Sequence, residues 1–176
     1  PAARSGLQMV AVSRGVGQDS SSSVADSEGE QDVASRSGIL VASPRLQNPQ
    51  LRAFAAMDFR ALARAEAAND YRAASVHLAS LLESAVIDTA LTRAAELRLT
   101  GRPEAWDIAD VAARLIGDRC SARDRSMLSF IFEAQRLVRP AQQLEMPLVV
   151  TPGSYQSHCE FVAVVLRMLG CNTTPQ

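Results

Sequence analysis

The chain has 176 residues, about the length of one domain, and 47% of them are hydrophobic, so it can build a core of its own. All 18 basic residues are arginine, and the absence of lysine excludes Schiff-base chemistry, a P-loop nucleotide site and other lysine-dependent mechanisms. The formal net charge of −1 provides no overall field that would draw the protein to nucleic acid or to an anionic membrane.

Cysteine usage and hydropathy predict a cytoplasmic protein. Three scattered cysteines are too few for a disulfide framework, and an odd number fits a reducing compartment. No apolar run approaches the ~18 residues of a membrane span, so we expect no membrane association. The apolar run at residues 7–12 is too short for a signal peptide. The arginine- and alanine-rich usage resembles that of a high-GC bacterial or phage genome.

Residues 1–47 are predicted to form an irregular N-terminal arm. Residues 13–38 are rich in serine, glycine and acids and bury too little apolar surface to offset the entropy of ordering. Two apolar runs, 7–12 and 38–42, bracket this segment and have the composition of strands that can pair as a short β-ribbon. Because a lone ribbon is marginal in water, we expect the arm to lie on the helical body or on another chain.

From residue 48 onward the apolar period is helical. Asn48-Pro49 combines a capping side chain with proline at the first helical position, which predicts a helix over residues 49–67. Asn69-Asp70 then breaks and recaps the chain, and a long helix is predicted over residues 71–97. The inward positions predicted for these two helices are Leu51, Phe54, Ala55, Leu62, Ala65, Tyr71, Ala74, Ser75, Leu78, Leu81, Leu82 and Ala85.

A proline and a capping box predict the next two helices. Pro103 is expected to open a helix over residues 103–116, with acids in its first turn where the helix dipole favours them. Ser121 and Asp124 have the spacing of a capping box before a helix over residues 122–138. The inward positions predicted for that helix are Met127, Leu128, Ile131, Ala134, Leu137 and Val138.

A final helix is predicted after an irregular, proline-containing stretch in which residues 148–150 are extended. Thr151-Pro152 opens this helix and Gly170 ends it. No strand is expected in the body, residues 48–172. The predicted fold class is therefore an all-α, up-and-down bundle of about five helices, preceded by the irregular arm.

The candidates for metal or acid–base chemistry are few. His77 and His158 belong to no Cys-x-x-Cys or His-x-x-x-His pair, so no metal site is expected. No phosphate-binding glycine loop or Gly-x-Ser-x-Gly elbow occurs, so no nucleotide or other cofactor is expected. Glu104, Asp107 and Asp110 share one helix face, and we interpret them as solvated acids at a helix start, with acid–base catalysis or Mg²⁺ binding as the alternative.

His77 lies on the apolar side of the long helix. We interpret it as a half-buried histidine hydrogen-bonded to a neighbour, with a functional proton carrier as the alternative. The three cysteines are interpreted as isolated thiols rather than nucleophiles or zinc ligands.

Arginines are dense between residues 114 and 139, with a local excess of positive charge. Guanidinium groups at this density could contact RNA phosphates. They alternate with acids and lack an aromatic stacking platform, so an ordinary charged surface explains them equally well. The RNA-binding candidates are Arg119, Arg123, Arg125, Arg136 and Arg139.

Two motifs carry a family resemblance. Residues 70–74, Asp-Tyr-Arg-Ala-Ala, lead to Leu-Leu-Glu at 81–83, similar to a "Tyr-x-Ala-Ala … Leu-Leu-Glu" long helix. Residues 135–140, Gln-Arg-Leu-Val-Arg-Pro, stand in the place of an "Arg-Asn-x-x-His-Pro" signature. With the apolar closing helix, residues 69–170 resemble the HEPN superfamily, in particular its DUF4145-like branch.

The resemblance implies a possible ribonuclease site and also a defect in it. In that family the arginine and histidine of the signature cleave RNA, usually at a dimer interface. Here the arginine position falls on Gln135 and the histidine position on Arg139, whose guanidinium stays protonated and cannot act as a base. Arg136, shifted by one position, could take the electrostatic role. The catalytic candidates are therefore Arg136, Arg139 and His77, in a site that is degenerate.

These observations favour a non-catalytic, HEPN-like helical module that binds a protein partner or forms a homodimer. The second hypothesis is an RNA-binding protein or endoribonuclease that uses Arg136 and Arg139. A third is an unrelated bacterial or phage structural protein whose helices imitate the family pattern.

Overall fold

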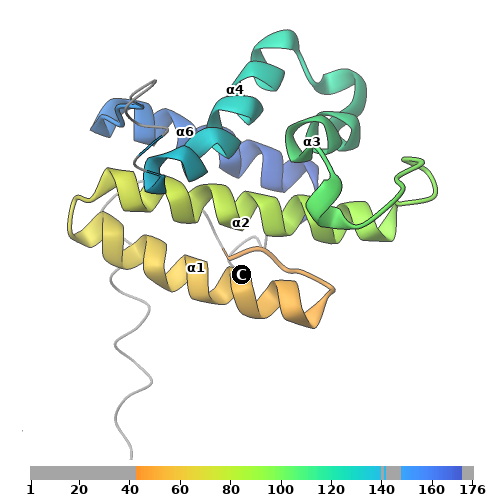
Figure 1. The fold of residues 1–176 in the computed structure, drawn as a ribbon, viewed down its shortest axis with the longest axis horizontal. Helices are drawn as coiled ribbons and strands as arrows, with labels where there is room; N and C mark the ends of the chain where they lie inside the picture. Colours follow the sequence, from red (N-terminus) through yellow and green to blue (C-terminus); the bar gives the residue numbers. More distant parts are fainter. Residues whose placement is uncertain (1–42, 140, 142–147, 172–176) are drawn as a thin grey trace, which may run out of the picture. The chain divides into compact units, whose positions relative to one another are not determined.

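The structure is a computed structural model that describes residues 43–139, 141 and 148–171, all of which belong to one compact unit. These residues form five α-helices and three short 3-10 helices, with no strand among them (Figure 1). The predicted all-α helical bundle is confirmed. Residues 1–42, with the predicted β-ribbon, lie outside the described part of the chain.

The first two helices begin where the capping residues predict. Helix α1 spans Pro49–Ala67, and the Asn48 side chain accepts hydrogen bonds from the first free amides. Helix α2 spans Tyr71–Thr92 after Asp70, whose side chain caps it. The two helices pack side by side (Figure 1).

Helix α2 ends at Thr92, so the prediction that it continues to Leu97 is wrong. The Thr92 hydroxyl donates to the Thr89 carbonyl, and the next amide, that of Arg93, bonds to Ala90 three residues back instead of four. Hydroxyl groups that take backbone carbonyls compete with the helical ladder, and here they coincide with its end. The following residues form turns in which Arg98 has a positive φ of 50°.

The third helix starts later than predicted. Pro103 opens only a 3-10 turn, Pro103–Ala105, and helix α3 spans Ile108–Ile116. The reason is Asp107, whose side chain accepts the amide hydrogen of Asp110 and so acts as the helix N-cap. Helix α3 ends at Gly117, as predicted, with a positive φ of 69°.

The fourth helix is shorter than predicted. Helix α4 spans Ala122–Phe132 behind the predicted capping box, and a 3-10 helix, η4, continues over Glu133–Val138. A 3-10 helix has about three residues per turn, which rotates later side chains away from the α-helical register. Val138 is therefore exposed, although its spacing predicted an inward position.

Helix α6 spans Pro152–Met168 and is capped by Thr151, as predicted. Helix α2 lies at the centre of the fold, in contact with α1, α3, α4, η4 and α6. The core is built mainly from small and branched aliphatic side chains. Its largest fully buried members are Leu78, Leu81, Leu82, Leu128, Leu137, Leu166, Val86, Val162 and Val165.

The segment before α1 is part of this core. Leu46 is buried, and the Arg45 amide donates to the Cys171 carbonyl at 2.9 Å. The buried Asp88 carboxylate of α2 accepts hydrogen bonds from the amides of Gln47 and Asn48 at 2.8 and 2.7 Å. The packed body therefore includes residues 43–47, which the sequence pattern assigns to the arm.

Helix α2 is also long and apolar enough to cross a membrane, the one such helix among the described residues. Of its most apolar stretch, 61% is buried inside the fold. The central helix of a soluble protein has the same properties, so this packing is compatible with a soluble protein.

Candidate functional site

His77 lies between α1 and α2 in a hydrogen-bonded cluster. Its Nδ1 is 2.9 Å from Oδ1 of Asp58, and the Ser80 hydroxyl donates to the other oxygen of that carboxylate at 2.5 Å. The side chains of His77 and Asp58 are both partly buried. His77 is thus the half-buried, hydrogen-bonded histidine that the sequence predicted.

The two arginines of the degenerate signature lie elsewhere. Arg139 is exposed just after η4, and the side chain of Arg136, within η4, lies outside the described part of the structure. Helix α2 meets η4 through Arg72, whose guanidinium donates to the Leu137 carbonyl. Positions 72 and 77 point ~140° apart around an α-helix, and His77 faces α1. The structure therefore brings His77 to Asp58 and not to Arg139.

The remaining RNA-binding candidates surround the start of α4. Arg119, Arg123 and Arg125 are exposed. The helix N-terminus beside them is occupied, because Ser121 and Asp124 bond each other's backbone amides. Hydrogen bonds from Ser121 hold the pKa of the Asp124 carboxyl below its usual value, so this position is firmly anionic. A fixed carboxylate among the arginines disfavours phosphate binding there.

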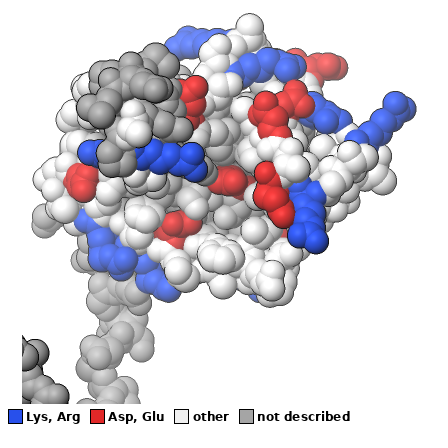
Figure 2. Space-filling model, in the orientation of Figure 1, with Lys and Arg blue, Asp and Glu red and all other residues white. Residues whose placement is uncertain are grey.

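The charge pattern of the surface is mixed. On the face drawn in Figure 2, basic and acidic side chains alternate and form no continuous basic area. The acids of the predicted solvated face follow the same pattern: Asp110 lies 3.8 Å from Arg114, and Glu104 lies 3.8 Å from Arg102. Such exposed pairs contribute little to stability and indicate an ordinary charged surface.

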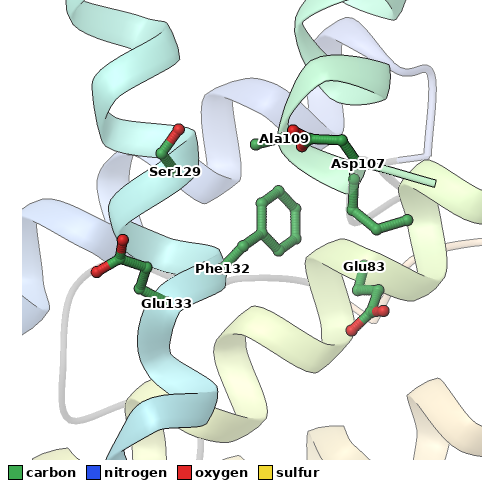
Figure 3. A pocket seen from close by; sticks show the side chains of 7 residues that line it. Glu83, Asp107, Ala109, Ser129, Phe132 and Glu133 are labelled. Atoms are coloured by element: carbon green, nitrogen blue, oxygen red, sulfur yellow. The ribbon is translucent and has the colours of Figure 1, made fainter. Parts of the chain in front are cut away.

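An open hollow of about 400 Å³ lies between α2, α3 and α4 (Figure 3). The ring of Phe132 stands in the middle of it, and the carboxylates of Glu83, Asp107 and Glu133 lie around the ring without pointing to a common centre. Within the described ranges, no group of three His, Cys, Asp or Glu residues could hold a metal ion. The hollow therefore has the acids but not the geometry of a cation site.

His158 lines a second, much smaller cavity of about 10 Å³ between α2, α4, η4 and residues 148–150, which precede α6. Its ring packs against Phe130 with centroids 5.1 Å apart, and burial lowers the pKa of the imidazole. The Ser75 hydroxyl also lines the cavity and has no hydrogen-bond partner among the described residues. This volume holds about one water molecule, too little for a substrate.

The three cysteines are free thiols, as predicted, and the structure shows that all three are buried. Burial raises the pKa of Cys120 and Cys171, and it raises that of Cys159 to about 11. A thiol in such surroundings stays protonated at neutral pH and is a poor nucleophile. Covalent catalysis by cysteine therefore has no support in this fold.

The surface with the clearest functional character is the outer face of α1, defined by Phe54, Met57, Arg60 and Arg64. Phe54 and Met57 lie one turn apart and are 59% and 57% exposed. Phe54 was predicted to point inward, and that prediction is wrong. The buried residues of α1 are Ala55, Leu62 and Ala65, and Phe54 lies beside this face. Two large apolar side chains on one turn suggest a contact surface.

Both acids of α1 point away from this face. Asp58 is bound to His77 and Ser80, and Glu66 accepts a 2.6 Å hydrogen bond from the Tyr155 hydroxyl of α6. The outer face of α1 therefore carries apolar and basic side chains and no acid. Sequence reasoning missed this surface. The available signal was the spacing of Asp58 and Glu66, which share a helix face with Leu62 and so indicated acids that turn inward.

No protein-family model, no curated protein and no solved structure matches this chain. The resemblance to the HEPN superfamily therefore rests on the sequence motifs alone.

Proposed function

We propose that this chain is a non-catalytic, HEPN-like helical module that assembles with another protein through the outer face of α1. The observation that carries the proposal is the joint exposure of Phe54 and Met57 on that face. Burying the exposed part of two such side chains in an interface contributes on the order of 1–2 kcal/mol each, enough to make them anchor residues.

The fold supports α1 rather than the long helix as the contact surface. Helix α2 is surrounded by α1, α3, α4, η4 and α6, whereas α1 packs mainly against α2. A second exposed apolar pair exists on α6, but its members, Val164 and Met168, are less exposed at 37% and 45%. We therefore place the assembly surface on α1 and expect the module to act in the cytoplasm of a bacterium.

The absence of a catalytic role is supported by the placement of the candidate groups. His77 is engaged by Asp58, its nearest charged neighbour, and the side of α2 that it occupies is not the one that meets η4. The buried thiols are protonated at neutral pH. None of these groups forms a nucleophile–base pair within the described residues.

The experiment that tests assembly is site-specific photo-cross-linking in cells that produce the full chain. A benzophenone amino acid replaces Met57 on the outer face of α1, and in a matched control it replaces the exposed Arg102 before α3. We expect one discrete, larger adduct from position 57 that is lost when Phe54→Ser is added, and no such adduct from position 102. Failure of position 57 to form an adduct would overturn the proposal.

A ribonuclease assay tests the non-catalytic part. The purified chain and its Arg139→Ala variant are incubated with labelled single-stranded RNA, and we expect the same background in both. Strand cleavage by the chain that disappears in the variant would replace assembly by endoribonuclease activity as the function.

A further inference from the structure

We infer that the partner presents an acidic, amphipathic α-helix to the outer face of α1. This inference deepens the proposed function and rests on it. It identifies the chemistry of the partner from the arginines that α1 exposes and from the acids of α1 that are bound by other residues of the fold.

The first step is the separation of charge across α1. The helix has two acids and three arginines. The two acids, both partly buried, are bound by His77, Ser80 and Tyr155. Arg52 donates to the carbonyls of Leu46 and Gln47 at the start of the helix. Arg60 and Arg64 are exposed, and neither forms an ion pair with a described residue. They are therefore available to carboxylates from outside.

The second step is their position beside the apolar pair. Phe54, Met57 and Ala61 are spaced by three and four residues and follow one line along the helix. Arg60 and Arg64, themselves one turn apart, follow a neighbouring line on one flank. A partner helix whose leucine side chains pack on Phe54, Met57 and Ala61 would bring the residues on its own flank close to the arginines. Carboxylates on that flank could accept two parallel hydrogen bonds from each guanidinium.

The third step is the comparison with a second copy of this chain. In parallel orientation the arginine flank of one copy would meet the opposite flank of the other copy, whose one acid, Asp58, is already bound by His77 and Ser80. In antiparallel orientation around Met57, Arg60 and Arg64 would face Phe54 and Gln50, which offer no carboxylate. Either arrangement leaves the guanidinium groups without a free opposite charge, which disfavours self-association relative to an acidic partner.

The test measures binding of synthetic helical peptides to the full chain by fluorescence anisotropy. The first peptide carries leucine at every third or fourth position and glutamate on the flanks. The second is identical except that lysine replaces every glutamate. We expect the chain to bind the glutamate peptide at least tenfold more tightly than the lysine peptide, with affinity falling as salt is raised. Equal affinity for both peptides, or no binding of either, would overturn the inference.

Charge reversal locates the site. The Arg60→Glu/Arg64→Glu variant is expected to reverse the preference, so that the lysine peptide binds more tightly. The matched control, Arg123→Glu/Arg125→Glu, changes two exposed arginines on α4 and is expected to keep the original preference. If both variants change binding equally, the outer face of α1 is not the site. Circular dichroism confirms that each variant keeps its helix content.

Two further arms identify other occupants. A Phe54-dependent dimer of the full chain in light scattering would show that a second copy covers the face. A peptide of the acidic segment 13–38 that binds more tightly than the glutamate peptide would show that the chain's own sequence covers it. Either result overturns the inference of an acidic partner helix. An adduct at position 57 to a protein without such a helix would overturn it too, while leaving the assembly function intact.

Discussion

The side of α2 that faces α1 carries His77, whereas the side that faces α4, η4 and α6 lies beside His158 of α6, and the two histidines have different surroundings. His77 is partly exposed and bonded to the Asp58 carboxylate, which also accepts from Ser80. His158 is buried against the ring of Phe130, beside a Ser75 hydroxyl without a described partner. One side of α2 therefore carries a satisfied polar cluster, whereas the region around His158 on the other side is apolar and leaves little free volume.

The difference teaches how the fold produces its outer surface. On the α1 side, internal polar groups are held by acids, and α1 supplies those acids from its own inner face. This use of Asp58 and Glu66 leaves the outer face of α1 with arginines but no carboxylate. On the opposite side, the packing depends on shape rather than on charge, so it contributes stability and no comparable surface chemistry.

The largest expected effect comes from breaking the apolar side. Leu78→Ala should lower the free energy of unfolding by about 3 kcal/mol, because Leu78 is 1% exposed and lines the small cavity beside His158. The same substitution at Leu91, which is 43% exposed on the same helix, should cost about 0.5 kcal/mol or less. Urea denaturation followed by circular dichroism measures both. Equal losses would show that the apolar side is not tightly packed.

Two serine substitutions on α2 are expected to change the free energy of unfolding in opposite directions, which sharpens the comparison. Ser80→Ala removes a donor to Asp58 and should lower the free energy of unfolding by about 1 kcal/mol. Ser75→Ala removes a buried hydroxyl that lacks a described partner and should raise it by a similar amount. Thermal denaturation of the two variants in parallel provides the measurement. A loss of stability in Ser75→Ala would mean that a water molecule in the cavity satisfies this hydroxyl.

The smallest expected effect depends on pH. Because burial lowers the pKa of His158 below its usual value of 6.5, the unfolded chain takes up the proton first on acidification. The stability that the neutral imidazole provides is complete above pH 6.5 and is lost as the pH falls from there toward the lower pKa of the folded state. His158→Phe should reduce this loss, whereas His77→Gln should retain it because His158 is still present. Urea midpoints between pH 7.5 and 5 measure the difference, and identical slopes in both variants would contradict the assignment.

The sequence predicts the local parts of this structure well. Helix starts follow from capping residues that act within three positions, such as Asn48, Asp70 and Thr151, and all three are confirmed. The end of α2 was predicted too late. The hydroxyls of Thr89 and Thr92 donate to backbone carbonyls at the end of the helix, and an apolar pattern contains no information about such hydrogen bonds. Asp107 was assigned to the first turn of a helix, although it is the cap that begins α3.

The candidate site could be predicted only in part, because it depends on contacts between distant segments. Asp58 meets His77 across 19 positions, and Glu66 meets Tyr155 across 89. The sequence analysis placed His77 and Tyr71 on the apolar side of the long helix but assigned no orientation to Asp58, Glu66 or Tyr155, so it could not identify these pairs. Phe54 was assigned to the core because it is a large apolar residue next to Ala55, and the sequence pattern alone does not show which of the two neighbours faces inward. Its exposure, on which the proposed assembly surface depends, could be seen only in the three-dimensional arrangement.

The backbone hydrogen bond between Arg45 and Cys171 joins two segments near the ends of the described part of the chain. A chain that continued from residue 171 to residue 43 through a short glycine linker would cross little space. New ends could be opened within residues 100–102, which lie between helices and are all exposed. The described part of the chain is therefore well suited to circular permutation, because the new ends would interrupt no α-helix and would leave the outer face of α1 intact.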